Sequence, residues 1–326
     1  QRGSLSAGGQ RCQVLPKWWI PEKQASFALE ATIAPGSLAR VTLPFDRGSY
    51  LDDSHRARLA DAFARNPRAV LLSIEHPSGE IFTYNVDQTS SPWPVPVVLV
   101  APKDLPILDA AERGGFPVTI DIAGEYRRGV GGWNVVAHLD RGAGRWLVVS
   151  TPVTSWFTST GERGPGIAGF LATARQAAAL FPDLDLAFVA TAGHEIGHGG
   201  MDYFLKHGAP PPSATLAWAH FGASLACRDT VVRLINSSTA LDPTVTRRFA
   251  GIEGLRLIGE RAAIGELREV HAAGYDRFFG MAGSHRFFHT PADSAQSSFA
   301  IELMEPILQA YLATLRDAAA IPSRAA

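Results

Sequence analysis

Short apolar runs alternate with helix-like segments along the second half of the chain. The runs at 146–151 and 184–189 are mostly apolar, with only Ser150, Thr151 and Asp185 as polar positions, as in strands that are buried on both faces of a parallel sheet. Between them, residues 167–180 are rich in alanine and leucine and predict a helix, and a last helix is expected from about 294 to 319. This alternation predicts a three-layer α/β/α domain with a mostly parallel sheet over residues 130–326.

The first half shows the same alternation on a smaller scale. An apolar run at 69–75 predicts a strand, and residues 54–65 have the pattern of an amphipathic helix. We therefore expect a smaller α/β domain over residues 27–125, in which histidines such as His55 stand isolated. Residues 1–26 look irregular and are expected to pack on the larger domain.

Composition excludes several classes of function. The chain has 326 residues, 46% apolar and 19% charged, which is typical of a globular protein. A formal net charge of −1 gives no reason to expect nucleic acid or an anionic membrane as a partner, and no run of 18 apolar residues is present to span a bilayer. The expected partner is a small molecule or a peptide, and the sequence leaves the oligomeric state open.

The compartment also stays open. The sequence begins with Gln1 and shows no leader, so a secreted or periplasmic location requires that a leader was removed, and a cytoplasmic one does not. The two cysteines, Cys12 and Cys227, either pair in an oxidising compartment or remain unpaired.

The densest candidate chemistry follows the second of the buried strands. The sequence HEIGH places His194, Glu195 and His198 within five residues and matches H-E-x-x-H. On a helix the two histidines would share one face and bind zinc, with the glutamate as general base. Four glycines surround the motif, and each disfavours a helix by about 1 kcal/mol relative to alanine. A helical zinc protease site is therefore kept as an alternative.

Five segments, taken in order, resemble the di-zinc aminopeptidase and glutaminyl cyclase family, whose members often carry an inserted protease-associated domain. The resemblance implies an aminopeptidase-like fold over 130–326, a protease-associated-like domain over 27–125, and a zinc-dependent hydrolase of amide or peptide bonds. The segments are VPVVLVAPKDLPILDAAERGGFPVTI, WNVVAHLDRGAGRWLVVST, GPGIAGFLATAR, FVATAGHEIGHGGMDYF and FFHTPADS.

The family's metal ligands are only partly kept. The resemblance places Pro152-Val153-Thr154 where the family has its first zinc histidine and an aspartate. It places Glu162 near the bridging aspartate, with Arg163 beside it, and this arginine would repel a dication or neutralise the carboxylate. A two-metal centre is therefore not expected.

The remaining ligand positions suggest one ion. The family's metal-binding glutamate is kept as Glu195, the next aspartate position is His220, and the last histidine is kept as His289. Three such ligands and a water suit one zinc ion or another divalent transition metal. His194 stands at the general-base position and is the expected proton carrier, and the alternative ligands are His198 and Glu162.

Other interpretations stay open. The fold can carry an inactive site that only binds, with Glu195 as a helix cap, His220 as a core residue, and Thr290 and Asp293 capping the last helix. Metal-free catalysis is a further alternative, with His194 as base, Glu195 as its orienting group and a hydroxyl nucleophile. The candidate hydroxyls are Ser150, Thr151, Thr154, Ser155, Thr158 and Ser159.

Overall fold

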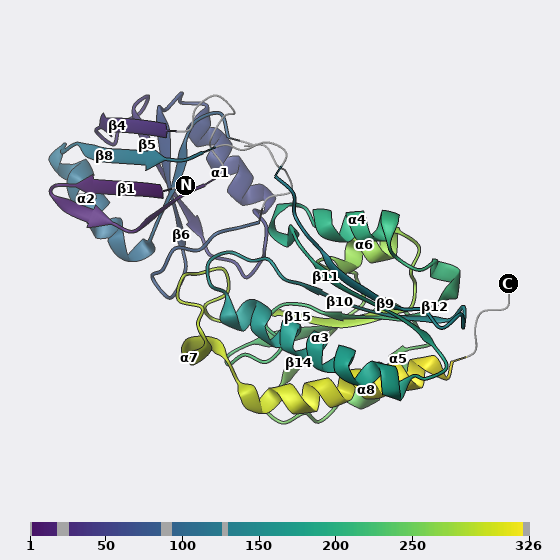
Figure 1. The fold of residues 1–326 in the computed structure, drawn as a ribbon. Helices are drawn as coiled ribbons and strands as arrows, with labels where there is room; N and C mark the ends of the chain where they lie inside the picture. Colours follow the sequence, from purple (N-terminus) through teal and green to yellow (C-terminus); the bar gives the residue numbers. More distant parts are fainter. Residues whose placement is uncertain (1, 18–25, 86–92, 126–129, 322–326) are drawn as a thin grey trace. The chain divides into compact units, whose positions relative to one another are not determined.

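The computed structural model describes residues 2–17, 26–85, 93–125 and 130–321 (Figure 1). The chain divides into two compact units, Gln1–Gly131 and Gly132–Ala326. Across the described ranges, no helix combines the length and apolarity needed to cross a bilayer. Cys12 in the first unit and Cys227 in the second are both buried free thiols.

The first unit holds two four-stranded sheets that enclose one apolar core. The antiparallel sheet has the order β2-β1-β8-β4, and the mixed sheet has the order β3-β7-β6-β5. The core between them includes Leu5, Leu29, Leu71 and Leu108. The strands are β1 (Arg2–Ala7), β2 (Gln10–Cys12), β3 (Val14–Pro16), β4 (Ser26–Ala31), β5 (Leu38–Pro44), β6 (Ala69–Glu75), β7 (Val97–Val100) and β8 (Val118–Ala123), and the helices are α1 (Asp53–Phe63) and α2 (Leu105–Gly114), the latter preceded by a 3-10 turn (Pro102–Asp104).

Residues 2–17 of the N-terminal segment belong to this first unit, and the expectation that residues 1–26 pack on the larger domain stays a prediction. Strand β1 pairs with β8 along its whole length and buries Leu5 and Ala7 on one face. Gly8 and Gly9, both at positive φ, form the two-residue turn into β2, a conformation that hairpins favour. These glycines had made the segment look irregular, and residues 18–25 lie outside the described residues.

The second unit is built on a seven-stranded sheet with the order β14-β13-β15-β12-β10-β11-β9. Strands β15, β12, β10 and β11 run parallel to one another, whereas β9 is an antiparallel edge and β13 is antiparallel to β15. The predicted mostly parallel sheet is thus confirmed. The strands are β9 (Val135–Leu139), β10 (Trp146–Pro152), β11 (Asp185–Thr191), β12 (Thr215–Phe221), β13 (Val231–Asn236), β14 (Arg256–Glu260) and β15 (Phe278–Ser284).

Helices cover both faces of this sheet, which completes the predicted three layers (Figure 1). Both faces of the sheet are apolar, because alternate residues of β10 point to opposite sides. Leu147 and Val149 join the core under α3 (Thr160–Leu180) and α8 (Met304–Ala319), and Val148 joins the opposite core under α4 (Gly199–His207). The other elements are α5 (Asp242–Phe249), α6 (Leu267–Ala272), α7 (Ala295–Ser298) and the 3-10 turns η2 (His194–Ile196), η3 (Pro212–Ala214) and η4 (Ile301–Leu303).

Two adjacent glycines after the HEIGH sequence have very different surroundings. A Cβ on Gly200 would lie against the carbonyl oxygen of Ala192 and 2.5 Å from Asn134 Oδ1, whereas a Cβ on Gly199 would meet nothing within 4 Å. The Gly200 amide also donates to the Ala192 carbonyl at 3.0 Å, so the backbone has no room to move away. Only the second glycine is required by packing.

We expect Gly200→Ala to lower the free energy of unfolding by about 1–3 kcal/mol, as overpacking against backbone does. Gly199→Ala serves as the control and should be neutral or stabilise by up to about 1 kcal/mol, because alanine favours a helical first turn. Urea denaturation of both variants measures the difference. Equal effects would show that the two glycines do not differ in this way.

Candidate functional site

The carboxyl ends of the parallel strands bring several loops to one edge of the sheet. The loop after β10 carries Thr154, the loop after β11 carries His194 and Glu195, and the segment after β15 carries His289. Open α/β sheets bind ligands at this edge. The first turn of α3 adds Glu162 and Arg163, as the contacts below describe.

Arg163 is the centre of the cluster. Its Nη2 lies 2.8 Å from Glu162 Oε1 and 2.7 Å from Glu195 Oε1, so one guanidinium bridges both carboxylates. Its Nε donates to the carbonyl oxygen of Thr154 at 2.6 Å. All three charged side chains are at least nine-tenths buried. Buried charges persist only when they are paired, and here one cation serves two anions.

Thr154 holds Glu195 from the other side. Its hydroxyl donates to Glu195 Oε2 at 2.6 Å and accepts from the amide of His194 at 3.1 Å. Thr154 stands where the resemblance placed the aspartate that accompanies the family's first zinc histidine. Glu195 is therefore bound by an arginine and a threonine, and it does not act as the helix cap that the sequence left open.

His289 joins the same group. Its Nε2 lies 3.3 Å from Glu162 Oε1, and its ring stacks on Phe288 with centroids 3.9 Å apart. Burial by itself raises the pKa of the Glu162 carboxyl, but Arg163 and His289 act against burial and lower that pKa from its ordinary value of 4.5 to about 2. Burial by itself also lowers the pKa of Arg163, but Glu162 and Glu195 outweigh it and raise that pKa.

His220 has different partners. Its Nδ1 lies 2.8 Å from Ser150 Oγ, which also accepts from the indole nitrogen of Trp218 at 2.7 Å. Burial lowers the pKa of His220 to about 4. Within the described part of the second unit, no three histidine, cysteine or acidic residues place ligand atoms within 4.8 Å of one another. The predicted set of Glu195, His220 and His289 on one ion therefore stays a prediction that requires these side chains to move.

The helical form of the HEIGH motif is absent. His194 lies in a 3-10 turn, which ends at Gly197 with φ of 90°, and His198 has a left-handed φ of 57° before α4 begins. The glycines interrupt the helix as their low helix propensity predicts, so the interpretation as a helical zinc protease was wrong. The rings of His194 and His198 nevertheless lie with their centroids 4.7 Å apart.

Two glutamates that sequence reasoning missed bind these histidines. His194 Nδ1 lies 3.2 Å from Glu266 Oε1, and His198 Nδ1 lies 2.9 Å from Glu269 Oε2. Glu266 is fully buried and accepts from the hydroxyl of Thr191 at 2.7 and 2.8 Å. The sequence did contain a signal for this pair. The two glutamates are three positions apart in a segment expected to be helical, and residues at that spacing share one face of a helix.

His194 remains neutral near pH 7. Burial lowers its pKa well below the ordinary value, Arg163 lowers it further, and Glu195 acts in the opposite direction. A neutral imidazole offers one donor and one acceptor nitrogen, which suits a residue that exchanges a proton with a ligand.

Asp293 fixes the start of α3 and does not cap the last helix. Its carboxylate accepts from the amides of Gly161 at 2.8 Å and Glu162 at 3.0 Å. Pro165 lacks the amide that would bond the Gly161 carbonyl within the helix, and this carbonyl accepts instead from the thiol of Cys227 at 3.1 Å. The position of Arg163 is therefore set by distant parts of the chain.

Several buried polar atoms around Arg163 make no hydrogen bond to the described residues: Arg163 Nη1, both carboxylate oxygens of Glu162, and His194 Nδ1. Glu162 Oε1 pairs with Arg163 Nη2, and His194 Nδ1 lies 3.2 Å from Glu266 Oε1, but Arg163 Nη1 has no such contact among the described residues. Buried polar groups are nearly always satisfied in native proteins. These atoms therefore mark the place where water or a ligand would bind.

No protein-family model matches the sequence, and no curated protein matches it. Solved structures do match, among them the zinc aminopeptidase BSAP from Bacillus subtilis, with a TM-score of 0.75 and 14% identity over 100% of this chain and 83% of that one. A peptidase M28 precursor from Shewanella amazonensis has a TM-score of 0.69 and 16% identity over 100% and 82% of the two chains. An aminopeptidase from Aneurinibacillus sp. strain AM-1 has a TM-score of 0.59 and 15% identity over 96% and 79%.

The second unit and the chain as a whole thus have the fold of these aminopeptidases. At such identities the likeness shows the fold alone. The residues present do not fit a two-zinc centre, because one buried guanidinium pairs with both Glu162 and Glu195.

The depressed pKa of Glu162 predicts a specific pH dependence of stability. Because the folded-state value, about 2, lies below the ordinary value of 4.5, this carboxylate stabilises the fold fully above about pH 4.5 and loses its contribution as the pH falls toward 2. Glu162→Gln should lower the free energy of unfolding at pH 7 by about 3–5 kcal/mol, as breaking a buried pair does. The difference from wild type should narrow on acidification.

Denaturant unfolding at several pH values between 7 and 2.5 measures this difference, with the exposed Glu253→Gln as a control that should track the wild type. A Glu162→Gln deficit that stays constant over this range would contradict the proposed ionisation of Glu162.

Proposed function

We propose that this chain is a binding protein on an aminopeptidase fold, in which Arg163 takes the place of the catalytic metal and the pocket holds the amino end of a peptide or a similar small molecule. The observation that carries the proposal is the pair of contacts from one Arg163 nitrogen to Glu162 and Glu195. In the resemblance, Glu162 stands near the family's bridging aspartate and Glu195 at its metal-binding glutamate. Both carboxylates thereby contact the same guanidinium.

Electrostatics supports the absence of zinc chemistry at this place. A dication placed about 4 Å from a guanidinium is repelled by about 8 kcal/mol at an effective dielectric constant of about 20. The two carboxylates attract a dication, but to coordinate it they would have to release the arginine, which is buried and tied by its Nε to Thr154. A bound zinc ion would thus leave a buried cation without a partner, which is costly.

The buried polar atoms of this cluster that make no hydrogen bond determine which ligand would fit. Arg163 Nη1 can donate to a carbonyl or carboxylate oxygen, and the Glu162 oxygens can accept from an ammonium group. His194, neutral and supported by Glu266, can donate or accept next to them. An ammonium group adjacent to a carbonyl is the chemistry of an amino acid or of a peptide's amino end.

For the first unit, we propose a domain of the protease-associated type. The support is that the match to BSAP covers the whole chain, and that the unit combines two sheets with helices as the resemblance implies.

A second candidate function is metal-free hydrolysis. The contact of 3.2 Å between His194 and the buried Glu266 favours it, because a carboxylate that orients an imidazole is the arrangement of a general base. In this candidate His194 takes a proton from an attacking water, and Arg163 stabilises the negative charge that develops on the carbonyl oxygen. Glu266 would then replace Glu195 in the orienting role that the sequence suggested.

Zinc analysis and an activity assay separate these functions from the single-zinc hydrolase. We expect no hydrolysis of aminoacyl p-nitroanilides by the purified chain, with or without added zinc. After dialysis against zinc, the metal content of wild type and of a Glu195→Gln, His289→Gln variant should be equal. Loss of one zinc equivalent in the variant would support the single-metal centre, and activity in a chelator that disappears in His194→Ala would support metal-free hydrolysis.

Ligand binding tests the proposal itself. Leucyl-leucine should bind in calorimetric titrations, and its N-acetylated form should bind at least about 10-fold more weakly because it lacks the ammonium group. Arg163→Lys should weaken binding of the dipeptide about 10- to 100-fold, the equivalent of one charge-assisted hydrogen bond. The matched control is Arg175→Lys, an exposed arginine of the same helix, which should bind as wild type does. Equal binding by both lysine variants, or no binding by wild type, would overturn the proposal.

A further inference from the structure

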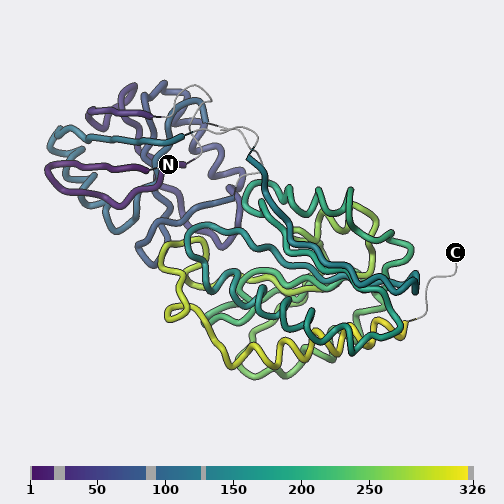
Figure 2. Tube along the Cα trace, in the orientation of Figure 1, coloured from purple at the N-terminus to yellow at the C-terminus, as the bar shows by residue number. Residues whose placement is uncertain are grey.

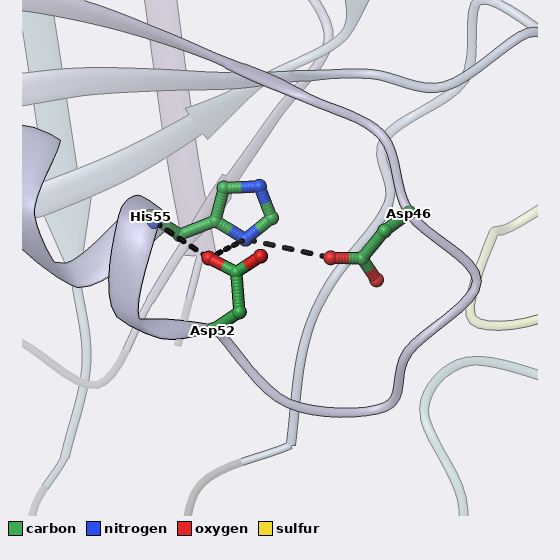
Figure 3. Close-up of side chains that lie close together, drawn as sticks. All are labelled: Asp46, Asp52 and His55. Atoms are coloured by element: carbon green, nitrogen blue, oxygen red, sulfur yellow. Dashed lines mark hydrogen bonds and ion pairs between the residues drawn. The ribbon is translucent and has the colours of Figure 1, made fainter.

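A second group of potential ligands lies in the first unit. Asp46 follows β5, Asp52 is the N-cap of α1, and His55 lies in the first turn of that helix (Figure 3). Figure 3 shows the two carboxylates approaching the same side of the imidazole ring. His55 looks isolated in the sequence, because the contact with Asp46 depends on the path of the loop between β5 and α1.

The ligand atoms are close together and converge on one nitrogen. His55 Nδ1 lies 3.6 Å from Asp46 Oδ2 and 3.5 Å from Asp52 Oδ1, and all three atoms lie within 4.8 Å of one another. Two ligand atoms bound to a tetrahedral ion at about 2.1 Å are separated by about 3.4 Å. The observed separations therefore match those of ligands around a transition-metal ion.

The other ring nitrogen determines which atoms His55 offers. Nε2 lies 3.0 Å from the carbonyl oxygen of Pro44, which can only accept, so Nε2 carries the proton. In the neutral ring, Nδ1 then directs a lone pair toward the two carboxylates. A metal-bound histidine usually donates its second N–H to a carbonyl or a carboxylate in this way.

Nδ1 has no hydrogen-bond partner among the described residues, and the side chain is only 2% exposed. A buried nitrogen lone pair facing two anions is unfavourable unless a cation or a proton stands between them. This unsatisfied atom is an observation separate from the acidic pair, and it points into the group.

Each carboxylate is also held in position by local hydrogen bonds. Asp46 Oδ1 accepts from the amide of Gly48 at 2.5 Å, which leaves Oδ2 toward the histidine. Asp52 Oδ1 accepts from the amide of His55 at 2.7 Å and the hydroxyl of Ser54 at 2.8 Å. The carboxylate side chains of Asp46 and Asp52 are 39% and 54% exposed, so water can complete the coordination from that side.

We propose that Asp46, Asp52 and His55 form a binding site for one divalent transition-metal ion in the first unit. One imidazole nitrogen with two carboxylates suits zinc or manganese, and calcium is disfavoured because it takes oxygen ligands. The ion joins the loop after β5 to the start of α1 and has a structural role. This site is independent of the function proposed for the second unit.

Zinc titration of the full chain by calorimetry tests the proposal. Wild type should bind one zinc ion, and an Asp46→Asn, Asp52→Asn variant should bind it at least about 10-fold more weakly. Asparagine caps a helix as well as aspartate does, so the variant keeps the start of α1. Asp53→Asn, which removes the neighbouring acid outside the group, is the matched control and should bind zinc as wild type does.

Thermal unfolding provides a second readout. Zinc should raise the midpoint of wild type and of Asp53→Asn, and it should leave the midpoint of the double variant unchanged, because only binding to the folded state stabilises it. Absence of zinc and manganese binding by wild type, or equal zinc binding by wild type and the double variant, would overturn the proposal. In the first case the group holds no metal ion, and in the second the metal lies elsewhere.

Discussion

The contact on which the second unit depends is that between Arg163 and two buried carboxylates. Glu162 lies in the first turn of α3 and Glu195 in the 3-10 turn after β11, and neither could remain charged inside the protein without a cation. BSAP, which has this fold, is a zinc aminopeptidase. In this chain an arginine side chain contacts both carboxylates.

An arginine is not equivalent to a metal ion. Its charge is spread over a plane and its donors have fixed directions, so it positions an oxygen without activating a water molecule as zinc does. The residues around Arg163 also differ from the metal ligands that the resemblance expects. Thr154 binds Glu195 where the resemblance expects a histidine and an aspartate, and His220 bonds to Ser150 at the position of a further acidic ligand. A binding function follows more directly from these residues than hydrolysis does.

The fold of the second unit could be predicted because strands buried on both faces have runs of apolar residues, as at 186–190. The neighbourhood of Glu162 and Arg163 was also foreseen, since the two are adjacent in sequence. The contacts that decide the chemistry were not. Glu195 and Arg163 are 32 positions apart in the sequence, and His194 and Glu266 are separated by a longer stretch of chain. No local sequence pattern predicts such pairs. Prediction from the sequence has the same limit in the first unit. His55 contacts Asp46 only because the loop between β5 and α1 brings the two residues together.

The start of α3 has a consequence for how the protein reaches its native state. Its first amides bond to a residue 132 positions further on, and one of its carbonyls bonds to a thiol 66 positions further on. Contacts between such distant positions form slowly, because a long loop must close before they are made. The place of Arg163 therefore depends on segments that lie far away in the sequence, so a change in the segment after β15 can displace the first turn of α3.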